Sequence, residues 1–386
     1  MELVADAGAS PPYDLRPPHQ GSRLHPGPRS LPIQSAGTRP IRSSRSRPRQ
    51  ALVLGAGGVL GAAWMTGALA AAQDVLQYDF SDVDLMVGTS AGSVLAAALR
   101  CGVGIDELVA YQRGEPIGLL EGIGELHGGP WPRPPRLRLG SPRLALAALT
   151  APLRVPPAVQ ACAWLPIGRD NHANLRAMVH LLHSRIPVTA ADTQLTAAAA
   201  AVAAPGWVNK ETWVIAVDYD SGHRVVFGRP GAPQARLAEA VVASCSLPGW
   251  YEPVVIGGRR YIDGGVRSVT SLSLLAAQDI DEVCVLAPMA SVIADRRYAP
   301  HMQLERRVRS LLTWLLMREA AELRATGVKV TVLTPGPEDL AAMGINLMDP
   351  RRRQAVLETS LRTSPATLAA HVAGTSGTAK PGRAAA

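Results

Sequence analysis

Residues 84–93 read D-L-M-V-G-T-S-A-G-S and run on into V-L-A-A-A-L at 94–99. The apolar residues before Gly88 predict a short buried strand, and the alanines and leucines after Gly92 predict a helix. Between them Ser90 is the centre of a G-x-S-x-G motif, which in this context is typical of a nucleophile elbow. The flanking small residues let strand and helix approach closely, and the positive end of the helix dipole favours negative charge that develops there. The stretch therefore predicts a parallel α/β fold and a nucleophilic serine.

A glycine-rich turn, G-A-G-G-V-L-G at 55–61, follows a short apolar run at 51–54 and precedes a predicted helix. One interpretation is a dinucleotide phosphate loop, but G-x-G-x-x-G cannot be placed because Ala56 and Leu60 stand where it requires glycine. A second is an oxyanion hole, in which successive glycines leave backbone N–H groups free to meet a negative oxygen. A third, tight packing of strand on helix, accounts less well for so many glycines. The turn therefore favours an oxyanion hole.

A third segment, Y-I-D-G-G at 261–265, follows A-S-C-S-L-P-G-W-Y-E-P at 243–253. Asp263 ends a predicted short strand just before two glycines, so we expect its carboxylate to project into a cleft. An aspartate before glycine is by itself most often a turn former. Its combination with the two motifs above favours a catalytic role.

Taken in order, the glycine turn, G-x-S-x-G, and D-G-G after A-S-x-x-x-P resemble the patatin-like phospholipase family over roughly residues 50–286. The resemblance implies a three-layer α/β/α sandwich with a mostly parallel central sheet and an inserted cap. It also implies a Ser–Asp dyad that hydrolyses acyl esters of lipids. On this resemblance Ser90 matches the nucleophile, Asp263 the base, and Gly57 and Gly58 the oxyanion-hole glycines. The remaining motif positions are Gly55, Gly61, Gly88, Gly92, Gly264 and Gly265.

A dyad also suits the histidines of this chain. A Ser–His–Asp enzyme needs a histidine as general base, but His172, His180 and His183 fall in the predicted cap rather than in a loop after a sheet strand. Asp263 can instead take the serine proton directly. Because an aspartate near its reference pKa of about 3.9 is a weak base, we expect a partly desolvated site.

The sequence predicts five parts: a basic arm over 1–49, a catalytic domain over 50–335, a cap within it over 115–187, a helical extension over 336–362 and a disordered tail over 363–386. The arm carries eight arginines against three acidic residues, and is too poor in apolar residues to fold. In the cap, frequent prolines interrupt short apolar stretches, and Trp131 and Trp164 are candidates to cover an acyl chain. Residues 303–325 predict an amphipathic basic helix, for which packing on the sheet is favoured over a membrane surface.

Composition and charge limit the kinds of molecule that the chain is expected to bind. The chain has 386 residues and a net charge of +8, much of it in the arm, and shows no pattern typical of nucleic-acid recognition. Its four scattered cysteines form no C-x-x-C pair, which predicts a reducing compartment and no zinc site. We expect a cytoplasmic protein that acts on a lipid or phospholipid substrate and uses no cofactor or metal. Peripheral contact with a membrane is a further expectation.

Three alternatives to lipid-ester hydrolysis remain at this point. The same acyl-enzyme can transfer its acyl group to an acceptor other than water. The chain can instead be a non-catalytic lipid-binding protein that retains the elbow. A nucleotide-binding domain is the least favoured, for the reason given above.

Overall fold

The structure is a computed structural model that describes residues 47–76, 79–124, 131, 133–150, 155–170, 172–185, 207–292 and 303–376. The arm predicted over 1–49 therefore lies outside the described residues except for its last three. Residues 377–386 of the predicted tail lie outside them as well.

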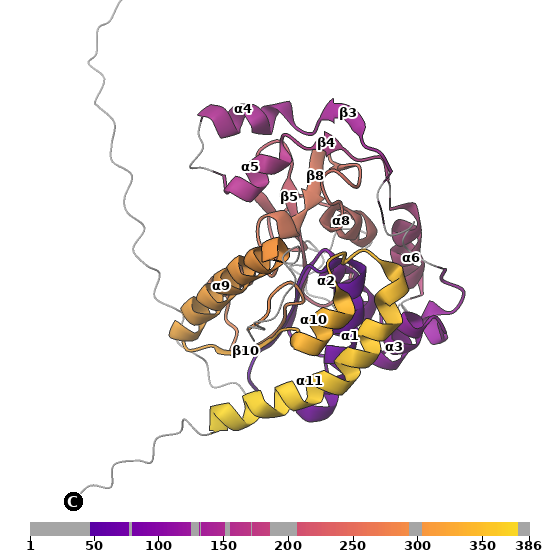
Figure 1. The fold of residues 1–386 in the computed structure, drawn as a ribbon, viewed down its shortest axis with the longest axis vertical. Helices are drawn as coiled ribbons and strands as arrows, with labels where there is room; N and C mark the ends of the chain where they lie inside the picture. The colour runs from indigo at the N-terminus through magenta and orange to yellow at the C-terminus, as the bar shows by residue number, and fades with distance from the viewer. Residues whose placement is uncertain are drawn as a thin grey trace, which may run out of the picture. The chain divides into compact units, whose positions relative to one another are not determined.

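An eight-stranded sheet forms the centre of the fold, with strand order β10-β9-β1-β2-β5-β8-β7 and with β6 paired to β5 (Figure 1). Five strands run parallel: β1 (Gln50–Leu54), β2 (Leu85–Thr89), β5 (Thr212–Asp218), β9 (Glu282–Leu286) and β10 (Lys329–Leu333). The antiparallel strands are β6 (Arg224–Phe227), β7 (Val254–Ile256) and β8 (Arg259–Asp263). Strands β5 and β6 form an antiparallel hairpin.

Both faces of the sheet are buried, because successive residues of a strand point to opposite sides. In β1, Leu52 and Leu54 enter one apolar core and Ala51 and Val53 enter a second. The first core is covered by α1 (Gly58–Leu76), α2 (Ala91–Arg100), α3 (Ile105–Arg113), α6 (Ala173–Ser184), α8 (Leu237–Ser244), α10 (Pro337–Met343) and α11 (Arg353–Ser376). The second is covered by α9 (Gln303–Ala325) and the short 3-10 helix η4 (Leu272–Ala277). The predicted three-layer α/β/α sandwich with a mostly parallel sheet is confirmed.

The region predicted as a cap contains α4 (Pro142–Thr150), α5 (Pro157–Cys162), α6, the 3-10 helix η1 (Gly118–Leu120), and a separate two-stranded sheet of β3 (Arg136–Leu139) and β4 (Pro166–Ile167). Helices α4 and α5 lie at the top of Figure 1 and pack through Leu144 and Val159 on Val217 of β5. Helix α6 packs instead on α2 and α8. The two parts of the region therefore cover different places on the domain.

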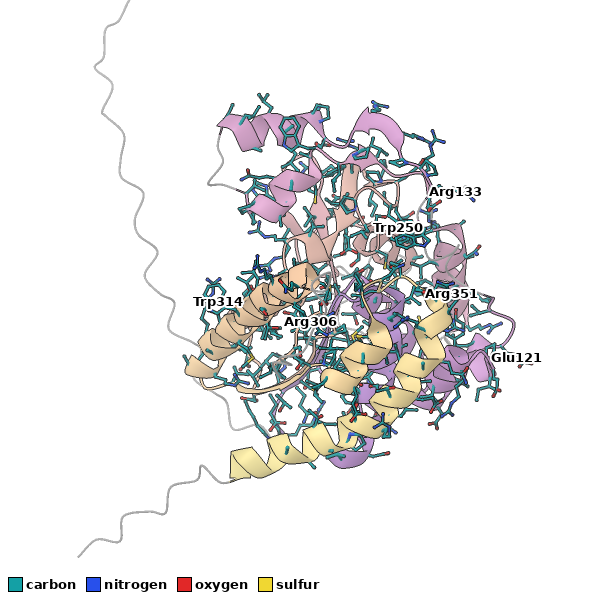
Figure 2. The ribbon with its side chains drawn as sticks, viewed as in Figure 1. Glu121, Arg133, Trp250, Arg306, Trp314 and Arg351 are labelled. Carbon is teal, nitrogen blue, oxygen red and sulfur yellow. The ribbon has the colours of Figure 1, made fainter. Side chains whose placement is uncertain are left out.

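Helix α9 connects β9 to β10 and packs on the sheet as predicted, with Leu316, Ala320 and Leu323 buried in the second core. Its opposite side is not covered by the described residues: Figure 2 shows Trp314 on the outer side of the helix. None of the helices in the described part of the chain combines the length and apolar character that crossing a membrane requires.

The predicted disordered tail is wrong for residues 363–376, because α11 continues to Ser376. This helix packs along α1, and its small residues are buried where the two helices meet. Ser360 Oγ donates to the Trp64 carbonyl at 2.8 Å, and a Cβ on Gly67 would lie 2.7 Å from the Ser360 Cβ. In the predicted tail, Ser364 is buried at the same place, with its Oγ 3.1 Å from that of Ser360, so a small residue that suggests disorder in the sequence permits a close helix–helix approach.

Candidate active site

Ser90 lies in a strained turn between β2 and α2. Its φ is +52° and its ψ is −123°, a backbone conformation that a residue with a side chain adopts only at a cost of about 1–3 kcal/mol. Hydrogen bonds hold it there: the Ser90 amide donates to Ser244 Oγ at 2.8 Å, and Ser93 Oγ donates to the Ser90 carbonyl at 2.7 Å. Ser244 Oγ in turn donates to the Ile215 carbonyl of β5. The predicted elbow is therefore present and is clamped from the neighbouring strand.

The two glycines of the elbow allow α2 to pass close to the sheet. A Cβ on Gly88 would lie 2.5 Å from the Ser93 Cα. A Cβ on Gly92 would lie 2.0 Å from the Leu54 carbonyl oxygen at the end of β1. No side chain fits at either position, which explains in physical terms why the motif places glycine on both sides of the serine.

Strand β8 brings Asp263 to Ser90 because two strands meet end to end along one edge of β5. The register pairs Thr89 of β2 with Ile215, and pairs Asp263 with Ala216, the next residue of β5. Strand β6 occupies the other edge of β5 over the same residues. The end of β8 therefore meets the end of β2, which places the Ser90 hydroxyl beside the Asp263 carboxylate in one cavity.

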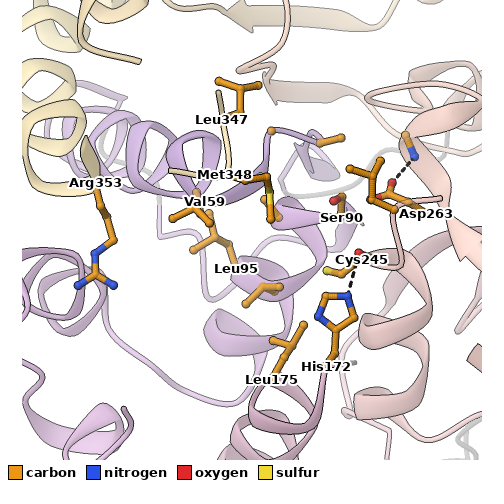
Figure 3. Close-up of a pocket in the computed structure, with 18 of the residues that line it drawn as sticks. Val59, Ser90, Leu95, His172, Leu175, Cys245, Asp263, Leu347, Met348 and Arg353 are labelled. Atoms are coloured by element: carbon orange, nitrogen blue, oxygen red, sulfur yellow. Dashed lines mark hydrogen bonds between the residues drawn. The ribbon is translucent and has the colours of Figure 1, made fainter. Parts of the chain in front are cut away.

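Backbone contacts fix the Asp263 carboxylate. The Gly265 amide donates to Asp263 Oδ1 at 2.7 Å (Figure 3). The Asp263 amide donates to the Ser246 carbonyl at 3.0 Å. Gly264 and Gly265 permit this tight turn, since a Cβ on Gly264 would lie 2.4 Å from the Ile215 carbonyl oxygen. The aspartate therefore faces the serine through a rigid turn.

Burial raises the pKa of Asp263 from its ordinary value of 3.8 to about 6, against the lowering effect of the neighbouring Ser90 hydroxyl and of the Gly265 amide. The desolvation that the sequence led us to expect is present, and it makes the carboxylate a stronger base than a solvated aspartate.

The glycine-rich turn of residues 55–61 joins β1 to α1 beside this pair. Gly58 has a φ of +61°, and its helix position leaves its N–H without an intrahelical acceptor. The amides of Leu60 and Gly61 are bonded to the carbonyls of Leu347 and Gly57, whereas those of Gly57 and Gly58 meet no acceptor within the part of the chain that the structure describes. Gly57 also packs on Pro288, which leaves no room for a side chain. Two amides at the start of a helix thus remain available beside Ser90.

A cavity of about 340 Å³ opens onto the serine, the aspartate and the two glycines (Figure 3). One face of α2 lines it over two turns, with residues Ala91, Val94, Leu95 and Ala98. Further apolar lining comes from α1, α3, α6 and the segment before α11; it includes Val59, Leu108, Leu175, Met178 and Leu347. The predicted cover by Trp131 and Trp164 is not observed: neither lines the cavity, and both are exposed. The cap contributes α6 instead, because that helix packs on α2.

His172 and Cys245 are cavity residues that the sequence did not single out for this site. The His172 ring stacks on Tyr251, with centroids 3.7 Å apart, and its Nε2 lies 3.0 Å from the Cys245 carbonyl oxygen. The Cys245 thiol contacts Ser93 Oγ at 3.9 Å, and burial raises its pKa. His172 thus supports the backbone of the 245–246 segment, which holds Asp263, and offers its Nε2 to that segment rather than to Ser90. For Cys245 the available sequence signal was the A-S-x-x-x-P segment, which contains this cysteine next to Ser244.

The described residues contain no group of side chains suited to hold a metal ion. Across the described ranges, no three His, Cys, Asp or Glu side chains come together in a way that could hold an ion.

The family model of patatin-like phospholipase matches residues 52–275, more than half of the chain, so the chain belongs to the patatin-like phospholipase family. This membership places it among lipid hydrolases and confirms the resemblance drawn from the three motifs.

Solved structures similar to this chain include VipD from Legionella pneumophila, at 13% identity and a TM-score of 0.34. That alignment covers 81% of this chain and 67% of VipD. The similar structures also include full-length ExoU of the Pseudomonas aeruginosa type III secretion system, in complex with SpcU, at 17% identity and a TM-score of 0.34. That alignment covers 82% of this chain and 54% of ExoU, so the chain spans about half of the ExoU length. The comparison with curated proteins found no match.

Proposed function

We propose that this chain hydrolyses acyl esters of lipids through an acyl-enzyme on Ser90, with Asp263 as general base and the amides of Gly57 and Gly58 as oxyanion hole. The observation that carries the proposal is the placement of the Ser90 hydroxyl beside a buried carboxylate, in a mostly apolar cavity that both residues line. A nucleophile held against a base in this way is the arrangement that acyl transfer requires.

In the first half of the proposed reaction, Ser90 Oγ bonds to the ester carbonyl carbon while its proton moves to Asp263. The negative charge on the carbonyl oxygen is stabilised by the two glycine amides and by the positive end of α1. When the tetrahedral intermediate collapses, the ester C–O bond breaks and the leaving alcohol takes the proton from Asp263. In the second half, Asp263 accepts a proton from the water that attacks the acyl carbon. The bond between Ser90 Oγ and that carbon then breaks, Asp263 returns the proton to Ser90 Oγ, and the carboxylic acid is released.

The cavity supports an acyl chain as the group that occupies the site. Ala98 lies eight residues beyond Ser90, so the apolar face of α2 extends about 12 Å from the nucleophile along the helix axis. Such a surface solvates methylene groups and offers few partners to a polar substituent. The lining therefore supports a lipid ester as substrate.

The direct test is labelling with a fluorophosphonate probe, followed by mass spectrometry of the peptides. We expect a single adduct on Ser90, and we expect lipid esters to slow its formation. Ser90→Ala should form no adduct and hydrolyse no ester. Ser81→Ala is the matched control, because Ser81 is exposed and does not line the cavity. Ester turnover that survives in Ser90→Ala would contradict the proposal, and a folded chain that resists labelling would favour lipid binding without catalysis.

Chain-length selectivity tests the role of the cavity. Ala98→Phe places a ring in the distal part of the cavity, so we expect kcat/KM for dodecanoyl and longer nitrophenyl esters to fall at least about 10-fold, with butanoyl ester hydrolysis nearly unchanged. Ala369→Phe, an exposed position on α11, is the control for the same change outside the cavity. An unchanged chain-length profile in Ala98→Phe would mean that the acyl chain lies elsewhere.

A further inference from the structure

Helix α9 presents apolar residues on two sides. Leu316, Ala320 and Leu323 are buried against the sheet. On the other side, Val308, Leu311 and Trp314 are 48%, 56% and 58% exposed. We call these three residues the outer apolar face. Large side chains so exposed on neighbouring turns of one helix mark an interaction surface rather than isolated surface residues.

Two arginines lie along the same side of the helix. Residues 307, 311, 314 and 318 are spaced by four, three and four positions, which places them in one stripe of an α-helix. The Arg318 guanidinium lies 5.1 Å from the centre of the Trp314 ring and 3.6 Å from Glu322. Arg307 is exposed and pairs with no carboxylate among the described residues. In this stripe an arginine at each end flanks one aliphatic and one indole side chain.

The topology places the start of this stripe near the edge of the sheet that carries the active site. Because β9 and β10 are parallel, the connecting α9 begins at their carboxyl ends and returns to their amino ends. The contacts agree: Arg309 Nη1 donates to the Pro288 carbonyl at 2.8 Å, and the Ser291 amide donates to Thr313 Oγ1 at 2.8 Å. Pro288 packs on Gly57, and Met289 lines the cavity. The outer apolar face is therefore one loop away from the glycine turn.

We propose that the outer apolar face of α9 docks on an anionic lipid surface and so holds the chain at the surface that contains its lipid substrate. Indole and aliphatic groups with adjacent arginines are the combination that enters the boundary between lipid headgroups and acyl chains. Helix α9 carries five arginines and three glutamates, so its charge favours an anionic surface. The functional consequence rests on the proposed lipid-ester hydrolysis, whereas the docking itself does not.

The test is sedimentation with vesicles of phosphatidylcholine alone or mixed with phosphatidylglycerol, using full-length Ser90→Ala protein so that binding is measured without chemistry. We expect binding to be stronger with phosphatidylglycerol and to fall at least about 10-fold when Leu311→Ser and Trp314→Ser are combined. Ile117→Ser with Val255→Ser, two exposed aliphatics away from α9, is the matched control and retains binding. Arg307→Gln with Arg318→Gln removes most of the preference for the anionic vesicles.

Activity provides the second measurement. In protein with Ser90 intact, we expect Leu311→Ser with Trp314→Ser to leave the hydrolysis of nitrophenyl butanoate unchanged and to lower the hydrolysis of vesicle lipid. Equal vesicle binding by this variant and its parent would overturn the proposal, as would a dimer that dissociates in the variant without any change in vesicle binding. A chain that hydrolyses no ester but binds vesicles through this face would refute the proposed function and still support the docking.

Discussion

Asp263→Asn is expected to lower kcat/KM for a soluble ester by about 10³-fold, because the amide cannot accept the serine proton. Its shape and its acceptor for the Gly265 amide are retained, so the turn that carries residue 263 should keep its geometry. The parent enzyme should gain activity as pH rises through about 6, where the carboxylate ionises, and level off above it. The residual activity of the variant should lack that dependence.

The same substitution is expected to stabilise the protein at alkaline pH. The pKa of Asp263 is raised in the folded state, so the folded chain binds the proton more tightly, and stability is lost as pH rises from about 4 through about 6. The difference between 3.8 and about 6 corresponds to ~3 kcal/mol at most. We therefore expect the free energy of unfolding of Asp263→Asn to exceed that of its parent by about 1–3 kcal/mol at pH 8. Near pH 4 this difference should vanish.

Urea unfolding at the two pH values, beside the pH profile of kcat/KM, measures both effects. Lost activity together with gained stability is what a buried functional base produces, since a structural carboxylate stabilises the fold that contains it. A variant that is inactive and also less stable at pH 8 would assign Asp263 a structural role.

Gly92→Ala is expected to prevent folding, or to destabilise the domain by more than about 4 kcal/mol. The added Cβ would lie 2.0 Å from the Leu54 carbonyl oxygen and 2.8 Å from that of Gly55. Both atoms belong to backbone that cannot easily yield, because Leu54 pairs with β2 and β9 and the Gly55 amide donates to the Leu286 carbonyl. The elbow and the centre of the sheet would have to separate.

Soluble yield, circular dichroism and the urea midpoint measure this effect. Gly124→Ala is the matched control: a Cβ there meets nothing within 4 Å, so we expect a change within about ±0.5 kcal/mol. A Gly92→Ala protein as stable as its parent would show that α2 does not need this close approach.

Much of this fold follows from residues that are close together in the sequence. The strand β1 with its glycine turn, the elbow at Ser90 and the hairpin β5–β6 are each specified by an apolar run next to small or turn-forming residues. Such signals act within about ten residues, because they arise from backbone conformation and from side-chain periodicity. The residues of the candidate site could be predicted for that reason, since each is the polar or glycine position that ends such a run.

Their arrangement depended on packing between distant segments. Asp263 reaches Ser90 only because β8 and β2 share one edge of β5, and the sequence contains no sign of that register. The cavity forms where α2 meets α6, so Leu175 and His172 line it while Trp131 and Trp164 do not. The raised pKa of Asp263 likewise comes from burial by residues far away in the chain. The residues around the nucleophile can be identified from local sequence. Burial, register and the shape of the cavity depend instead on contacts between segments that come together only on folding, so the tertiary structure decides them.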